Sequence, residues 1–105
     1  MPDLPSLRQL RYLVALAEHR NFTRAAEACF ATQSTLSAGL KELEQTLGVR
    51  LVERDRHSVT MTPIGEETAQ RARDLLAAAE DLAATAAGAA APMTGMLRLG
   101  VIPTI

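Results

Sequence analysis

A leucine stripe between residues 32 and 48 constrains the fold of this chain more than any other feature. The stripe consists of Leu36, Leu40, Leu43 and Leu47. This spacing places all four side chains on one face of an α-helix. Thr32 is a suitable N-cap ahead of the stripe, and Gly48 directly after it is typical of a helix end. We therefore expect one amphipathic helix from Thr32 to Leu47.

Two further helices are expected before this one. Ser6 and Gln9 form a capping-box pattern. The apolar residues that follow at helical spacing are Leu7, Leu10, Leu13, Val14 and Ala17. A short second helix spans residues 22–29, with Thr23 as its expected N-cap, and Phe30 and Ala31 form a brief turn. Two short helices joined by such a turn predict a helix-turn-helix.

The hydrophobic period changes after Gly48. Residues 51–54 and 59–62 are β-prone, and the polar residues 55–58 connect them, which predicts a two-stranded hairpin, or wing. Thr62 and Pro63 then open a long helix that runs to about Ala90. Its heptad seam consists of Thr68, Ala72, Leu75, Ala79, Leu82 and Ala86. The seam is expected to need a partner helix.

The fold class is therefore mostly α: a winged helix-turn-helix of three helices and a two-stranded β wing, followed by a long linker or dimerisation helix. We expect the DNA-binding domain at residues 1–62 and the dimerisation helix at 63–91. Residues 92–105 are expected to be a hinge and the first strand of a truncated second domain, because a single strand is not stable alone.

Composition limits the function classes. The chain has 105 residues, is 48% hydrophobic and has a net charge of −1. Residues up to Thr62 carry eight basic and seven acidic side chains, whereas residues from Pro63 onward carry three and five. This weak asymmetry does not by itself indicate DNA. A single cysteine, and the lack of a signal-like or membrane-length apolar run, favour a cytoplasmic, nucleoid-associated protein with no membrane partner.

The candidate DNA-reading residues lie on the polar face of the leucine-striped helix. These are Gln33, Ser34, Thr35, Ser37 and Lys41, which follow the expected N-cap Thr32 in the chain. A helix enters the major groove with its N-terminal residues near the base edges, and a glutamine amide both donates and accepts, as adenine's edge requires. A polar first turn of an ordinary surface helix is the alternative explanation.

Two other segments are expected to reach the DNA backbone. Thr23 and Arg24 begin the second helix, where they can contact phosphate or serve as a plain cap with a solvated arginine. Arg54 and Arg56 of the wing are expected to reach phosphate or the minor groove, with a solvated hairpin tip as the alternative.

The residues provide no sign of an enzyme, a cofactor or a metal site. The two histidines are far apart, and neither a glycine-rich phosphate loop nor a nucleophile–base pair is present. Cys29 is expected to be a small core residue rather than a redox group.

Several runs together resemble the N-terminal domain of LysR-type transcriptional regulators. They span residues 10–18, 22–27, 32–37, 43–54 and 59–65. Residues 95–104 resemble the first strand of that family's effector-sensing domain. Within the family, three sequence segments are most similar to the OxyR group of hydrogen-peroxide-sensing activators: LVALAEHRNFTRAAEAC, QSTLS and LGVIPT. One departure is Ser34, where many members have proline.

The resemblance implies a function beyond what spacing shows. Members dimerise through the linker helix, often form tetramers, bind interrupted palindromes in double-stranded DNA and act on RNA polymerase. It places Gln33 to Lys41 on the recognition helix, and Arg54 and Arg56 on the wing. An OxyR-like oxidative-stress activator is the expected function. The alternatives are a LysR-type regulator that responds to a small organic metabolite and a winged-helix module that binds protein instead of DNA.

Overall fold

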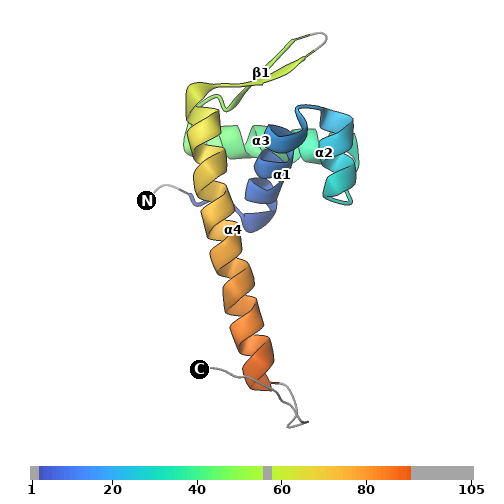
Figure 1. The fold of residues 1–105 in the computed structure, drawn as a ribbon. Helices are drawn as coiled ribbons and strands as arrows, with labels where there is room; N and C mark the ends of the chain where they lie inside the picture. The colour runs from blue at the N-terminus through green and yellow to red at the C-terminus, as the bar shows by residue number, and fades with distance from the viewer. Residues whose placement is uncertain (1–2, 56–57, 91–105) are drawn as a thin grey trace.

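The computed structural model describes residues 3–55 and 58–90, and within them the chain forms four helices and a hairpin (Figure 1). The expected strand at residues 92–105 and the wing residues Arg56 and His57 lie outside the described residues. The mostly α, winged helix-turn-helix prediction is confirmed. Three short helices pack together beside the upper half of one long helix, and the hairpin projects above them.

Helix α1 (Leu7–His19) begins at the predicted capping box. The Ser6 hydroxyl accepts from the backbone N–H of Gln9 at 3.1 Å, and the Gln9 amide oxygen accepts from the N–H of Ser6 at 3.0 Å. Leu13 and Leu16 are fully buried at the centre of the core. The helix ends at Arg20, which adopts a left-handed conformation with φ 54°.

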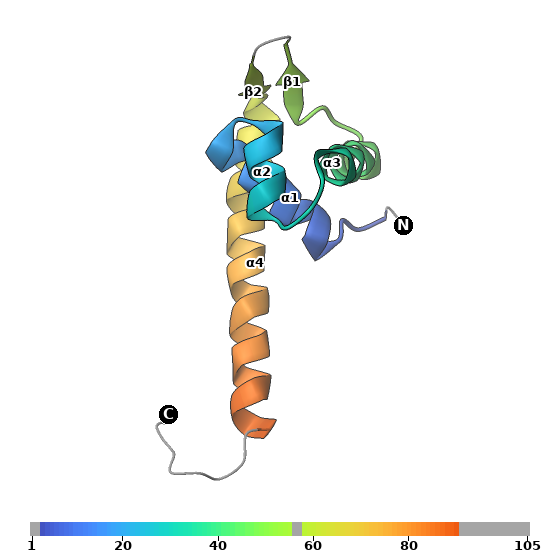
Figure 2. The same cartoon turned by 90° about the vertical axis from the view of Figure 1, so that its right-hand side faces the viewer.

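Helices α2 (Phe22–Ala28) and α3 (Gln33–Leu47) form the helix-turn-helix. Figure 2 shows α3 nearly end-on beside α2 and α1. The predicted leucine stripe is confirmed, since Leu36, Leu40 and Leu43 are fully buried. Gly39 is buried next to Tyr12, and an added Cβ would lie 2.7 Å from the tyrosine ring, so a glycine is required for this close approach.

The structure corrects the expected cap of α2. Asn21, not Thr23, is the N-cap, because its side-chain oxygen accepts from the backbone N–H of Arg24 at 2.8 Å. Both residue types are good caps. The helix starts two residues earlier than a cap at Thr23 would allow, because the left-handed Arg20 turns the chain and leaves Asn21 extended.

Strands β1 (Val52–Arg54) and β2 (Val59–Met61) pair antiparallel, with Val52 opposite Met61 and Arg54 opposite Val59. The wing is therefore confirmed, one residue shorter at each outer end than expected. Val52 and Met61 are buried at its base. Gly48 ends α3 with φ 72°, as its position predicted.

Helix α4 (Pro63–Ala90) has two parts with different surroundings. The first part packs against α1 and joins the core through Ala69, Ala72 and Leu76. Gly65 allows the helix to approach the wing, because an added Cβ would lie 1.9 Å from the carbonyl oxygen of Leu51. The second part extends away from the other elements, and all residues from 80 to 90 are exposed (Figure 1).

Candidate nucleic-acid interface

The first turn of α3 is exposed and has no role in the core. Gln33, Ser34 and Thr35 are exposed, and Ser37 is half-buried. Thr32 caps the helix as predicted: its hydroxyl accepts from the backbone N–H of Thr35 at 3.1 Å and bonds the Thr35 hydroxyl at 2.8 Å. A firmly capped turn with short polar side chains matches the shape requirement of the major groove.

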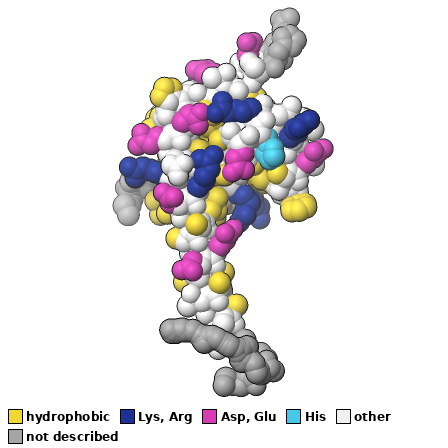
Figure 3. Space-filling view, viewed as in Figure 1, with side chains coloured by type: hydrophobic (Ala, Val, Ile, Leu, Met, Phe, Trp, Pro, Cys, Tyr) yellow, Lys and Arg dark blue, Asp and Glu magenta, His cyan; other side chains and the backbone are white. Residues whose placement is uncertain are grey.

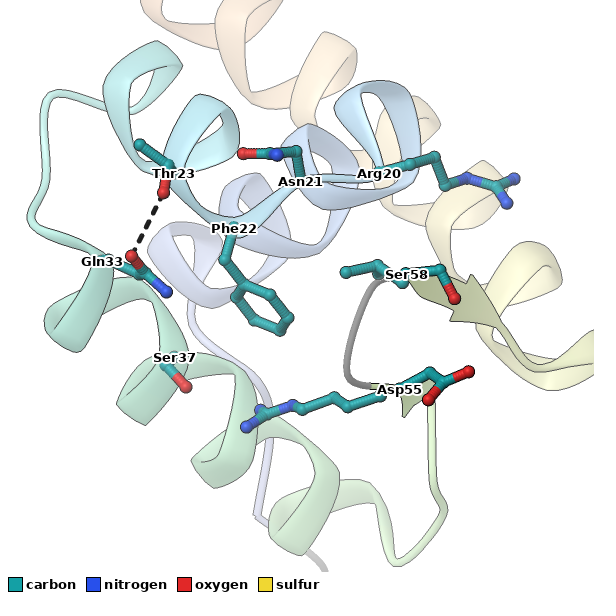
Figure 4. A pocket seen from close by; sticks show the side chains of 10 residues that line it. Arg20, Asn21, Phe22, Thr23, Gln33, Ser37, Asp55 and Ser58 are labelled. Carbon is teal, nitrogen blue, oxygen red and sulfur yellow. Dashed lines mark hydrogen bonds between the residues drawn. The ribbon is translucent and has the colours of Figure 1, made fainter.

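An open hollow of about 360 Å³ lies between the start of α2, the start of α3 and the wing (Figure 4). Its lining residues are Arg20, Asn21, Phe22, Thr23, Gln33, Ser37, Arg54, Asp55, Ser58 and Val59. The hollow brings together three segments that the sequence analysis considered separately: the second helix, the recognition helix and the wing.

Thr23 lies beside Gln33 instead of capping its own helix. Its hydroxyl donates to the Gln33 amide oxygen, with an oxygen–oxygen distance of 3.2 Å (Figure 4). Asn21 provides the cap of α2, so the Thr23 hydroxyl is available for this bond. The structure thus joins two of the predicted DNA-binding residues directly.

Phe22 connects α2 to the wing. The guanidinium carbon of Arg54 lies 4.7 Å from the centre of the Phe22 ring, a cation–π distance. The ring points into the hollow between α3 and the wing (Figure 4). Stacking of this kind orients an arginine while its N–H edge stays available to an acceptor.

The cations around the first turn of α3 differ in how far they are neutralised. Arg24, Lys41 and Arg54 are exposed and form no salt bridge with any carboxylate that the structure describes. Arg20 instead pairs with Glu66 of α4 at 2.7 Å. Figure 3 shows acidic and basic side chains mixed over one face of the globular part, so position rather than net charge distinguishes the three unpaired cations.

Sequence reasoning missed the residue that connects α3 to the wing. Glu44 accepts from the backbone N–H groups of Leu51 and Val52, at 2.8 and 3.2 Å. These are the residues at which the chain turns into β1. Glutamate on the polar side of a helix is typical of a solvated position, and no pattern in the sequence marks the loop that folds back onto it.

The predicted dimerisation seam is divided between two environments. Leu75 and Leu82 are 55% and 71% exposed, and Ala86 is exposed, whereas Thr68 and Ala79 are half-buried. Ala72 corrects the prediction: it is 1% exposed because it packs in this chain's own core, so it has no surface to offer a partner.

The described residues give little support for a metal site, a membrane-spanning helix or a reactive thiol. No group of three or more His, Cys, Asp or Glu side chains converges on a metal site within residues 3–55 and 58–90. None of the helices described combines the length and the apolar character needed to cross a bilayer. Partial burial raises the pKa of the Cys29 thiol above its ordinary value of 9.0, and the nearby Arg11 opposes the increase. The thiol is therefore poorly disposed to form a reactive thiolate.

Comparison with known proteins gives consistent matches. The family described as bacterial regulatory helix-turn-helix protein, lysR family, matches residues 7–66. The HTH-type transcriptional regulator EstR of Acinetobacter baylyi is 57% identical over the whole chain, which covers 35% of EstR. The DNA-binding transcriptional dual regulator OxyR of Escherichia coli is 43% identical over 95% of the chain, which covers 33% of OxyR. The chain thus spans about a third of the length of these relatives.

A solved structure agrees with the sequence matches. The BenM DNA-binding domain in its complex with catB site 1 DNA superposes with a TM-score of 0.77 and 36% sequence identity, covering 83% of this chain and 97% of that one. The likeness extends over the helix-turn-helix and the wing together with much of the long helix, because 83% of the chain cannot be covered without it.

Proposed function

Because the chain belongs to the LysR family of bacterial helix-turn-helix regulators, we propose that it reads a specific sequence in double-stranded DNA through the first turn of α3. The observation that carries this proposal is the exposure of Gln33, Ser34 and Thr35 beside cations that no described carboxylate neutralises. In the proposed complex this turn enters the major groove, where an amide and short hydroxyls meet the base edges.

Phosphate contacts supply most of the affinity in this proposal. Arg24 lies at the start of α2, Lys41 lies farther along α3, and Arg54 lies in the wing. All three are exposed and form no salt bridge within the described residues, so they are available to neutralise phosphates; Arg56 is assigned the same role from the sequence alone. Each neutralised phosphate releases counterions, so affinity falls steeply as salt rises. Base contacts from Gln33 and its neighbours then determine which sequence is preferred.

The second half of α4 is proposed to pair with the same segment of another copy. Leu75, Leu82 and Ala86 are exposed, and no other element within residues 3–55 and 58–90 covers them. After Asp81, α4 carries no charged side chain up to Ala90. Burial of two exposed leucines per chain favours association. The dimer would present two copies of α3 to an interrupted palindrome, and the full-length protein is proposed to form a tetramer and to act on RNA polymerase.

The signal to which the full-length protein responds is a separate proposal. Likeness to OxyR over 95% of the chain supports an oxidative-stress activator in the cytoplasm, associated with the nucleoid. The chain is more similar to EstR, at 57% identity, than to OxyR, at 43%, and the name of EstR mentions no peroxide; a regulator that responds to a small organic metabolite is therefore the second candidate. Footprinting of the full-length protein on its operator, with and without hydrogen peroxide, separates the two: a peroxide-dependent change supports the first, and an unchanged footprint supports the second.

Fluorescence anisotropy tests the DNA-reading proposal. The chain is titrated into a duplex with a LysR-type interrupted palindrome and into a scrambled duplex, at several salt concentrations. Four phosphate contacts per chain in a dimer, Arg56 included, give a slope of log K against log salt of about −7, and Lys41→Gln reduces its magnitude by about 2. The matched control is Arg71→Gln on α4, whose side chain is 78% exposed and pairs with Glu67.

Tighter binding to the palindrome, with two chains per duplex, supports the proposal. If Arg71→Gln weakens binding as much as Lys41→Gln does, the assigned surface is wrong. No binding to either duplex at low salt would favour the protein-interaction alternative.

A further inference from the structure

We infer that Thr23 is a positioning residue for Gln33, and that through it α2 influences which base the recognition helix prefers. This inference rests on the proposed function. Its starting point is the bond from the Thr23 hydroxyl to the Gln33 amide oxygen, at 3.2 Å (Figure 4). The two residues belong to different helices and are ten positions apart, so the bond depends on the packing of α2 against α3.

The two helix caps next to this pair are already engaged. Asn21 caps α2, so Thr23 does not need to bond its own backbone. The Thr32 hydroxyl donates to the Thr35 hydroxyl at 2.8 Å, so it has no hydrogen left to donate to the Gln33 amide. The Gln33 side chain thus has one partner that fixes its orientation, on the side facing α2.

The bond determines which edge of the amide faces the DNA. A carbonyl oxygen has two lone pairs, so an oxygen that accepts from Thr23 can also accept from the exocyclic amino group of adenine. The amide nitrogen then donates to adenine N7. If the amide rotates freely, its nitrogen can instead donate to the two acceptors of guanine. A fixed amide therefore favours adenine over guanine.

The same bond restricts motion before DNA binds. Both residues are exposed, so in the free chain water competes for this hydrogen bond. In the major groove that competition is reduced, and an amide that is already oriented loses less conformational freedom on docking. The effect is on base preference, because Thr23 itself does not need to touch a base.

Selection from a pool of duplexes with a randomised central segment tests this inference. The wild-type chain, Gln33→Ala, Thr23→Val and Thr23→Ser are each allowed to bind, and the bound sequences are compared. The base pair read by Gln33 is the one whose preference Gln33→Ala removes. Thr23→Val keeps the shape of threonine without its hydroxyl, whereas Thr23→Ser keeps the hydroxyl. Circular dichroism confirms that each variant is folded.

We expect Thr23→Val to reduce the preference for adenine over guanine at that base pair by about fivefold, the effect of one ordinary hydrogen bond. Thr23→Ser should keep the wild-type preference for adenine. In a chain that already carries Gln33→Ala, adding Thr23→Val should cause no further change in base preference. Other positions of the site should keep their preferences.

Two results would overturn the inference alone. In the first, Thr23→Val keeps the wild-type preference for adenine over guanine, although Gln33→Ala loses that preference. The other is an equal loss of affinity for all duplexes with an unchanged salt dependence, which identifies Thr23 as an uncharged contact to the DNA backbone. If the wild-type chain enriches no sequence, the proposed function fails and this inference falls with it, so the two failures are distinguishable.

Discussion

Glu44→Ala should destabilise the chain strongly by releasing the wing from the recognition helix. The carboxylate of Glu44 accepts from two backbone N–H groups, those of Leu51 and Val52, at 2.8 and 3.2 Å. Leu51 is fully buried and Val52 is 3% exposed. Water therefore has poor access to the two donors once the carboxylate is removed, and each unsatisfied donor costs about 1–3 kcal/mol.

A smaller effect opposes this cost. Glu44 lies in the last turn of α3, where the helix dipole disfavours an anion by about 0.3–1 kcal/mol. The net loss in the free energy of unfolding is therefore about 1–5 kcal/mol, and each kcal/mol lowers the Tm of a domain of this size by about 4–8 °C. Thermal unfolding followed by circular dichroism measures the shift, at one protein concentration because the proposed dimer would make Tm depend on concentration.

Glu44→Gln is the matched control. It keeps an amide oxygen as the acceptor and loses only the charge assistance, so the expected loss is about 1 kcal/mol or less. The order of Tm should be wild type, then Glu44→Gln, then Glu44→Ala. A Glu44→Ala variant that unfolds within about 2 °C of the wild type, a change of well under 1 kcal/mol, would refute the claim that this carboxylate holds the wing.

Three further predictions concern packing, the wing and the thiol. Gly65→Ala should reduce the free energy of unfolding by about 1–3 kcal/mol in urea denaturation, because the added Cβ would lie 1.9 Å from the carbonyl oxygen of Leu51. Phe22→Leu should weaken DNA binding about two- to fivefold in anisotropy, because it removes the aromatic face 4.7 Å from Arg54. Cys29 should react with iodoacetamide more slowly in the folded chain than in the unfolded chain at about pH 7.5, since its raised pKa keeps the thiol protonated.

Each of these predictions has its own control. Gly88→Ala places its Cβ where nothing lies within 4 Å, so it should be neutral or slightly stabilising; equal losses in both alanine variants would contradict the close contact at Gly65. An effect of Phe22→Leu that persists undiminished in an Arg54→Gln background would show that the ring does not act through the arginine. Faster alkylation of the folded chain would contradict the shielding of the thiol.

The elements were predictable from the sequence because their signals are local. The capping box at Ser6, the cap at Thr32, the leucine stripe and the helix end at Gly48 each occupy a few adjacent positions, and each is present in the structure. The cap of α2 was predicted wrongly because Asn21 and Thr23 are both good caps two residues apart. Only the left-handed turn at Arg20 decides between them, and no local pattern marks that turn.

The contacts within the site were not predictable, since they join segments far apart in the chain. The bonds from Thr23 to Gln33 and from Phe22 to Arg54 depend on how α2, α3 and the wing are packed. Ala72 shows a different limit. A heptad seam has the same sequence pattern whether it packs against α1 of the same chain or against α4 of another copy. In the structure, Ala72 packs in the core of its own chain.

Backbone amide NMR spectra of the isotope-labelled chain, recorded with and without a selected duplex, test whether the first turn of α3 contacts DNA. We predict that the largest shifts on adding DNA occur in residues 32–37, 21–24 and 54, with small changes in residues 80–90 of α4. Largest shifts in the exposed part of α4, with the first turn of α3 unchanged, would contradict the claim that this turn reads DNA.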